Sequence, residues 1–365
     1  MRMKPITEFC TLNMGQSPDS KTYNESGNGL PFYQGNADFG EIHPETRVWC
    51  SEPVKIANAG DILISVRAPI GAMNIATERC CIGRGLAALT PITKNCNQQY
   101  LFYAIQSRVD DLIAQGTGST FKAISKKVLE STAIPAYNLD EQVQIVDKVC
   151  RVDKAIAKRK QQLALLDQLV KSRFIELFGD PQTNPKGWKQ LRFDQLCENL
   201  DSRRVPITST DRKAGIYPYY GASGIVDYVE DYIFDEDLLL ISEDGANLVM
   251  RSTPIAFSIS GKTWVNNHAH VVRFASPATQ KYIEVSFALT DISGSITGTA
   301  QPKLNQAKLN AMLFGMPPME LQEQFAAFVE QTDKSKYYSS QSYRYCQMAA
   351  NTYRQEWMTC RTLNS

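Results

Sequence analysis

The sequence of 365 residues lacks any long apolar run and has almost no net charge, at +1. No window approaches the roughly 18 consecutive apolar residues that a membrane-spanning helix needs. The N-terminus leads into a polar segment and not into the apolar core of a signal peptide. With 43% hydrophobic and 21% charged residues, the composition predicts a soluble cytoplasmic protein, without a membrane partner and long enough for two ordinary domains.

Paired metal or disulfide ligands are also missing. The nine cysteines are dispersed and none forms a CxxC pair, which favours reduced thiols over a disulfide framework or a zinc site. Only three histidines occur. Two of them, His268 and His270, could provide ligands from alternate positions of a strand, but a third ligand would have to come from elsewhere. We therefore expect no bound metal, and a structural or ligand-contacting role for this pair.

Catalytic motifs are equally scarce. Residues 261–263 (Gly-Lys-Thr) loosely match a phosphate-binding loop, but a β-like stretch follows where such a loop needs a helix. The Asp/Asn-Pro-Pro-Tyr/Phe motif of methyltransferases is absent, as are Gly-rich turns for a methyl-donor cofactor. The sequence predicts a protein without catalysis or cofactor. A cryptic nuclease around residues 19–21 or 211–213 remains a weaker alternative.

What the sequence does contain is an internal repeat of about 180 residues, far longer than a solenoid unit. The paired segments are residues 6–10 with 193–197, 30–35 with 217–221, 61–65 with 238–242, 116–119 with 297–299, and 139–142 with 321–324. Their order is kept while the offset drifts, as duplication followed by loop insertions and deletions would leave it. We infer that the chain contains two related copies of one unit.

Each copy combines a globular part with a helix. The globular parts have short β-like runs and many Gly, Pro and aromatic residues, whereas residues 139–178 contain no Gly or Pro. The predicted fold class is α+β, with two tandem mixed α/β domains at 1–137 and 179–318. Long helices follow at 138–178 and 319–365. The second of them turns polar and Tyr-rich after Lys336.

The first helix carries apolar residues at a spacing of seven. They are Val149, Ile156, Leu163, Val170 and Leu177. Such a spacing is typical of a coiled-coil seam. It predicts that this helix pairs with another helix.

Several motifs together resemble the specificity subunits of type I restriction enzymes. They are Met-Gly-Gln-Ser-Pro at 14–18, Asn-Pro-Lys-Gly-Trp at 184–188, Val-Asn-Asn-His-Ala-His at 265–270, and Gln142 and Gln324 at the starts of the helices. The resemblance covers nearly the whole chain. The order, spacing and duplication of these motifs are specific.

The resemblance implies two target-recognition domains, each reading one half of a split site in double-stranded DNA. It also implies that the two helices pair as an antiparallel coiled coil with pseudo-two-fold symmetry and set the unread gap. Implied partners are two copies of a DNA adenine methyltransferase subunit and a restriction/translocase subunit. The subunit itself would be non-catalytic. The main alternative is a scaffold that binds proteins through two similar domains.

Candidate DNA contacts are polar residues in Gly-containing loops, because major-groove readout needs bidentate donors and acceptors. In the first domain they are Gln34, Asn36, Arg67, Arg84 and Lys122. In the second domain they are Ser223, Arg251, Lys262, Asn266, His268 and Lys303. For Lys122, Lys126 and Lys127 we expect phosphate contacts, which position a protein on DNA without specifying sequence.

Overall fold

A computed structural model describes residues 2–118, 122–298 and 301–359. The chain divides into two compact units. Unit 1 contains the chain up to Arg159 together with the part from Ser342 onward, and unit 2 runs from Lys160 to Gln341. The predicted mixture of short strands with two long helices is confirmed. Among the described residues, no helix is long and apolar enough to cross a membrane.

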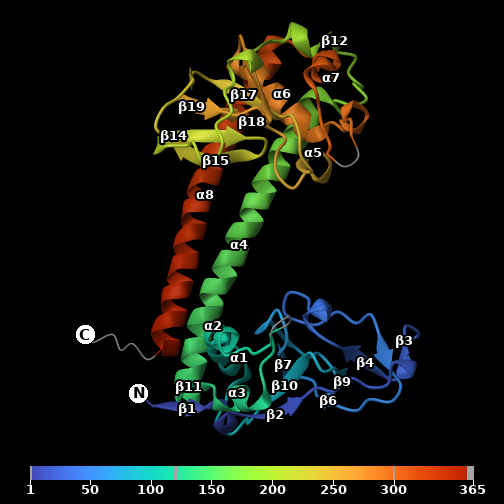
Figure 1. The fold of residues 1–365 in the computed structure, drawn as a ribbon, viewed down its shortest axis with the longest axis vertical. Coiled ribbons are helices and arrows are strands. Elements are labelled where there is room, and N and C mark those ends of the chain that lie inside the picture. The colour runs from blue at the N-terminus through green and yellow to red at the C-terminus, as the bar shows by residue number, and fades with distance from the viewer. Residues whose placement is uncertain (1, 119–121, 299–300, 360–365) are drawn as a thin grey trace. The chain divides into compact units, whose positions relative to one another are not determined.

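The globular part of unit 1 is built on small sheets (Figure 1). Its strands are β1 (Met3–Pro5), β2 (Cys10–Met14), β3 (Tyr23–Asn24), β4 (Leu30–Tyr33), β5 (Trp49–Cys50), β6 (Ile56–Ala57), β7 (Ile62–Ser65), β8 (Met73–Ile75), β9 (Cys80–Ile82), β10 (Leu86–Pro91) and β11 (Ala133–Pro135). Its short helices are α1 (Gln98–Gln106), α2 (Val109–Ala114) and α3 (Lys126–Ser131).

Unit 2 has a corresponding set. Its strands are β12 (Lys189–Arg192), β13 (Cys197–Asn199), β14 (Ala214–Gly221), β15 (Gly224–Val229), β16 (Phe234–Asp235), β17 (Leu238–Ser242), β18 (Ala256–Ile259), β19 (Lys262–Val265), β20 (Ala269–Phe274) and β21 (Leu313–Met316). Its short helices are α5 (Asn247–Met250), α6 (Pro277–Leu289) and α7 (Gln306–Ala311). The long helices α4 (Leu139–Phe178) and α8 (Met319–Thr359) each contribute residues to both units.

The topology of the sheets repeats between the units. The order β2-β10-β7-β8 in unit 1 corresponds to β13-β20-β17-β18 in unit 2, and the pair β1-β11 corresponds to β12-β21. In a second sheet of each unit, two strands pair in parallel, β4 with β9 and β14 with β19. Because segments matched by sequence occupy matching strands, the predicted duplication is confirmed.

The start of each long helix is held by a buried glutamine. The side-chain amide of Gln142 donates to the carbonyl of Tyr137, and that of Gln322 donates to the carbonyl of Pro317. Both glutamines lie five residues after their acceptor and are at most 2% exposed. The predicted equivalence of Gln142 with Gln324 is therefore wrong by two residues, because α8 begins at Met319 and Gln324 is exposed.

The C-terminus of α4 is capped by the motif at 184–188. The ammonium group of Lys186 donates to the carbonyls of Glu176 and Leu177, at 2.9 and 2.8 Å. The indole Nε1 of Trp188 donates to the carbonyl of Phe178 at 2.9 Å. These carbonyls have no partner within a helix, and a cation near them also interacts favourably with the helix dipole. The motif thus fixes how the chain leaves the helix.

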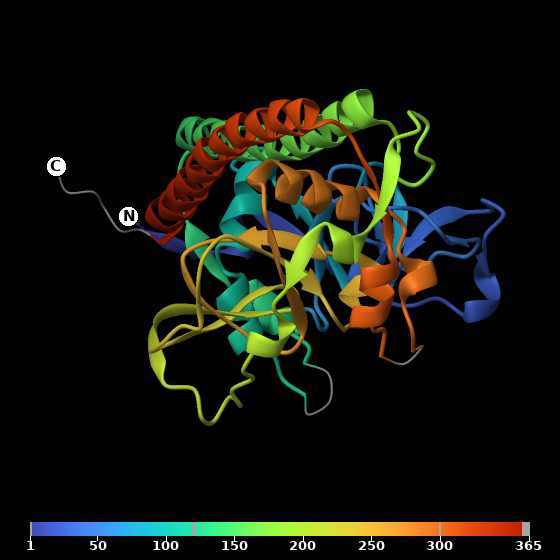
Figure 2. The same ribbon diagram turned by 90° about the horizontal axis from the view of Figure 1, so that it is seen from above.

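Within unit 2, α4 and α8 run antiparallel in contact. Phe174 packs against Phe325, and Lys336 forms an ion pair with Asp167 at 2.8 Å. A later residue of α4 therefore contacts an earlier residue of α8, which is the order expected of antiparallel helices. Helix α6 lies beside both long helices (Figures 1 and 2), with Tyr282 stacked on Phe174 at 5.3 Å. Val170 of the sevenfold series is buried here, while Leu163 and Leu177 are half-buried. Phe174 and Phe178 are buried as well, because α4 also packs on the globular core.

Candidate nucleic-acid interface

In unit 1, five short segments meet where the parallel strands β4 and β9 end. The amide of Gly85 donates to the carbonyl of Gln34, and the amide of Val66 donates to that of Gly85. Ala68 is joined in the same way to Lys122, at 3.1 Å. We call residues 34–36, 66–68, 83–85, 116–118 and 122–124 the first loop cluster. It contains Gln34, Asn36, Arg67, Arg84 and Lys122, of which all but the half-buried Asn36 are exposed.

The motif at 14–18 supports the first loop cluster from behind. A Cβ atom on Gly15 would lie only 2.1 Å from the carbonyl oxygen of Gly83, so only glycine permits this close approach. The amide of Gly15 donates to the carbonyl of Leu86, and the amide of Arg84 donates to the Ser17 hydroxyl. The chain carrying Arg84 is therefore held on both sides.

Unit 2 builds the same arrangement. The amide of Asn266 donates to the carbonyl of Tyr220, as that of Gly83 does to Tyr33, and the amide of Glu243 donates to the carbonyl of His268. Asp244 forms a β-bridge with Lys303, corresponding to the bridge between Arg67 and Ala123. We call residues 221–223, 243–245, 266–268, 297–298 and 301–304 the second loop cluster. It brings together Ser223, Asn266, His268 and Lys303.

The other predicted contacts lie outside these clusters. The guanidinium of Arg251 donates to the carbonyls of Phe287 and Thr290, so it caps the C-terminus of α6. The backbone of Arg251 itself is in the left-handed region, with φ of 51°. Lys262 begins β19, at the end opposite Asn266, with its ammonium 4.6 Å from the ring centre of Tyr232. Lys126 and Lys127 are exposed in the first turn of α3, directly after the first loop cluster.

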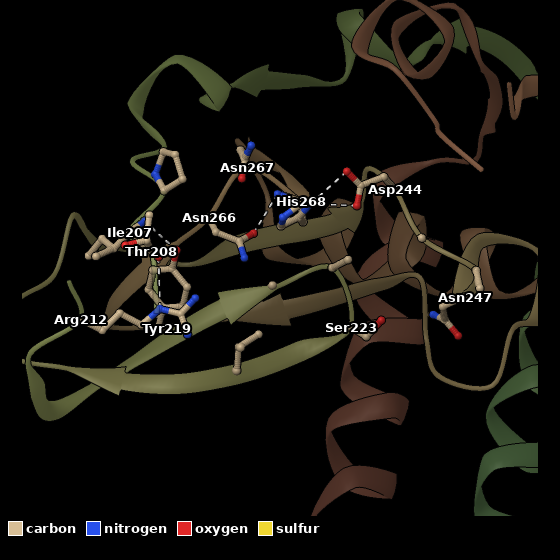
Figure 3. A pocket seen from close by; sticks show the side chains of 16 residues that line it. Ile207, Thr208, Arg212, Tyr219, Ser223, Asp244, Asn247, Asn266, Asn267 and His268 are labelled. Carbon is tan, nitrogen blue, oxygen red and sulfur yellow. Dashed lines mark hydrogen bonds and ion pairs between the residues drawn. The ribbon is translucent and has the colours of Figure 1, made fainter. Parts of the chain in front are cut away.

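The second loop cluster lines one side of a pocket of about 730 Å³ in unit 2 (Figure 3). The other side comes from the β14–β15 hairpin and from residues 206–212. His268 approaches the Asp244 carboxylate through Nδ1, at 2.9 Å, so this nitrogen carries the proton. A fixed ring, half exposed at 51%, can then meet a ligand through Nε2.

A buried network of charges lies behind this pocket. The Nδ1 atom of His270 is 2.6 Å from Oδ2 of Asp201, and its Nε2 atom is 2.8 Å from the carbonyl oxygen of Leu304. Both partners are acceptors, so both ring nitrogens donate and the imidazole is positively charged. Arg204 approaches Glu243 at 2.6 Å and Asp201 at 3.5 Å. The network fixes the strands from which the second loop cluster extends.

Both carboxylates of the network stay ionised. Burial acts against this, but the hydrogen bond from His270 holds the pKa of Asp201 below its usual 3.8. Burial likewise opposes ionisation of Glu243, and the hydrogen bond from Arg204 holds the pKa of Glu243 below 4.5. Asp201, Glu243 and His270 lie close enough to ligate one metal ion. Because the imidazolium and Arg204 already neutralise these carboxylates, the donor set does not fit a metal.

Sequence reasoning missed Asp244 and Asn267. Asn267 corresponds to Arg84. Arg84 follows Gly83 and Asn267 follows Asn266, and these two preceding residues each donate a backbone hydrogen bond to the last tyrosine of the equivalent parallel strand. The repeat could have identified it once the strands were aligned. The role of Asp244 depends on a hydrogen bond to a residue 24 positions away, for which a sequence pattern gives no signal.

The chain matches the type I restriction modification DNA specificity domain family over residues 1–167 and 185–339. It is similar to the MjaX specificity subunit of Methanocaldococcus jannaschii, with 43% identity over 155 residues, 42% of this chain and 36% of that relative. It is 22% identical to the MjaIX specificity subunit of the same organism over 90% of this chain and 85% of the relative. The crystal structure of a type I S subunit from M. genitalium shares the fold, at a TM-score of 0.61 and 13% identity, with 98% of this chain and 96% of that chain covered. From the match of its two halves to one family, we conclude that the chain belongs to the type I restriction modification DNA specificity family.

Proposed function

We propose that this chain is the sequence-reading, non-catalytic subunit of a type I restriction–modification enzyme. Each loop cluster reads one half of a bipartite site in double-stranded DNA. The observation that carries the proposal is the duplication of one loop cluster on one topology. Two related readers in one chain suit two half-sites on one duplex.

The domain organisation follows the same reasoning. We propose recognition domains at 1–137 and 179–318, each followed by a spacer helix, at 138–178 and 319–365. The antiparallel contact between Phe174 and Phe325 in unit 2 supports pairing of α4 with α8 as an antiparallel coiled coil with pseudo-two-fold symmetry. In that arrangement the helices set the length of the unread gap.

The proposed partners are two copies of a DNA adenine methyltransferase subunit and a restriction/translocase subunit. Two leucines on α4, Leu165 and Leu169, are 55% and 47% exposed. Apolar side chains one turn apart on a helix form a continuous surface, and such a surface supports docking of a partner subunit. The relatives are named as specificity subunits of type I restriction enzymes, which supports a role within a multi-subunit enzyme.

The function is tested by mapping methylated adenines in DNA incubated with the chain and a methyltransferase subunit of this family. We expect methylation within one split site when both proteins are present. We expect no methyl transfer and no DNA cleavage by the chain alone. Transfer or cleavage without a partner, or methylation without a split site, would contradict the proposal.

Lys126 and Lys127 are expected to contact phosphate. Each is exposed, and the ion pair of Lys126 with Glu130 is solvent-accessible, so either ammonium is available to DNA. Replacing either lysine with alanine should weaken binding to specific and random DNA alike. The slope of log K against log salt should fall by about one unit for each lysine. Fluorescence anisotropy titrations at several salt concentrations measure this slope, and an altered base preference at an unchanged slope would contradict the assignment.

A further inference from the structure

Asn266 presents an unpartnered hydrogen-bond donor to the pocket of the second loop cluster. The residue is only 6% exposed, yet it lines the 730 Å³ pocket. Its Oδ1 atom accepts a hydrogen bond from the backbone amide of His268 at 2.8 Å. Among the described residues, its Nδ2 atom has no hydrogen-bonding partner. This donor reaches the surface of the pocket, where the acceptor of a ligand can meet it.

The orientation of this amide is fixed by chemistry. The backbone N–H of His268 can only donate, so the atom of Asn266 that faces it must be the oxygen. The nitrogen must then face the other way. Figure 3 shows the oxygen end of Asn266 directed toward His268 and the nitrogen end away from it. Asn266 is therefore a donor toward the pocket, and its acceptor is already used.

The space in front of this donor is kept open by Gly221. A Cβ atom at Gly221 would lie 3.3 Å from Nδ2 of Asn266 and 2.7 Å from the side chain of Val226. Any larger residue at this position would cover the donor. The equivalent residue in unit 1 is Gln34, which follows Tyr33 as Gly221 follows Tyr220. The two loop clusters thus differ at this point, as readers of different half-sites would.

We propose that Asn266 is a specificity-determining residue that selects a keto base, guanine or thymine, at one position of the second half-site. The inference rests on the proposed function. In the major groove, guanine presents O6 and thymine presents O4 as acceptors, whereas adenine and cytosine present amino groups at the corresponding place. The Nδ2 donor pairs with the keto oxygen. An amino group at that place would bring its own N–H donor against the Nδ2 donor, and no hydrogen bond could form.

The test replaces the donor with an acceptor while the rest of the site is kept. In Asn266→Asp, one carboxylate oxygen retains the hydrogen bond from the His268 amide and the other faces the pocket. The wild-type chain and the variant are each combined with a methyltransferase subunit and a DNA library randomised over the second half-site. Sequencing of the methylated molecules gives the base preference at each position.

We expect the variant to change one position of the second half-site from a keto base to adenine or cytosine, by about tenfold in preference. Asn266→Ala, which leaves neither donor nor acceptor, should make that same position degenerate. Ser209→Asp adds an equal charge on an exposed residue next to the pocket-lining Thr208, and should lower the yield without changing any base. Thermal melting checks that each variant is folded.

Two failures are distinguishable. If the wild-type chain directs methylation to no split site, the proposed function is overturned together with this inference. If the wild-type chain directs methylation to a split site and both Asn266 variants select the same bases as the wild type, only the inference is overturned.

Discussion

Replacing His270 with leucine is expected to destabilise unit 2 by about 3–5 kcal/mol, because it removes one partner from a buried ionic network. His270 is 1% exposed and bridges Asp201 to the carbonyl of Leu304. Without the imidazolium, the Asp201 carboxylate stays buried with less compensation, and the Leu304 carbonyl loses its donor. Urea-induced unfolding of the full chain, followed by far-UV circular dichroism, measures the change.

The same network predicts how stability depends on pH. The pKa values of Asp201 and Glu243 are lowered in the folded chain from their usual 3.8 and 4.5. Their contribution to stability is thus fully present above those values, and it is lost as the pH falls through the lower folded pKa values. We expect the free energy of unfolding of unit 2 to drop below about pH 4, and this drop to be smaller in His270→Leu.

A matched control is His43→Leu. His43 is exposed, and its Nδ1 atom makes a single contact, 2.9 Å from the carbonyl of Ile75. Its replacement should cost less than about 1 kcal/mol. Equal losses of stability in the two variants would show that the network around His270 contributes nothing particular.

Phe174→Ala is expected to destabilise unit 2 by about 3–5 kcal/mol. Phe174 has no exposed surface and lies within 5.4 Å, between ring centres, of Phe178, Tyr282 and Phe325. These rings come from α4, α6 and α8, so the cavity would open where three helices meet. Urea unfolding measures the loss. The antiparallel contact between α4 and α8 should loosen as well, which faster hydrogen exchange of amides in the first turns of α8 would show.

Leu165→Ala provides the control for this variant, since it shortens another apolar side chain of α4 that is 55% exposed. Its effect on stability should stay within about 1 kcal/mol. If Phe174→Ala unfolds at the same urea concentration as Leu165→Ala, the aromatic cluster does not hold the helices together.

Local patterns were enough to predict much of this architecture. The repeat placed residues 61–65 and 238–242 in equivalent positions, and they form the matching strands β7 and β17. The absence of Gly and Pro predicted a helix that extends from Leu139 to Phe178. The β-like character after Gly261 excluded a phosphate loop, and residues from Lys262 onward do form a strand.

Contacts between distant residues could not be predicted in the same way. Arg251 is of a residue type that often contacts DNA. Its guanidinium instead donates hydrogen bonds to two carbonyls at the C-terminal end of α6, 36 and 39 residues further along the chain. His270 meets Asp201 across 69 residues. The register of the second helix start was missed because Gln322 and Gln324 both fit a one-dimensional pattern, and only the carbonyl of Pro317 selects Gln322. Such pairings depend on how strands and loops assemble.

The central claim is that the two halves of the chain read two separate half-sites. It is tested most directly by replacing residues 187–317 with the corresponding segment of another member of the family and mapping methylated adenines in cells that also express the methyltransferase subunit. We expect one half of the recognised site to change while the other half is kept. A change in both halves, or in neither, would contradict it.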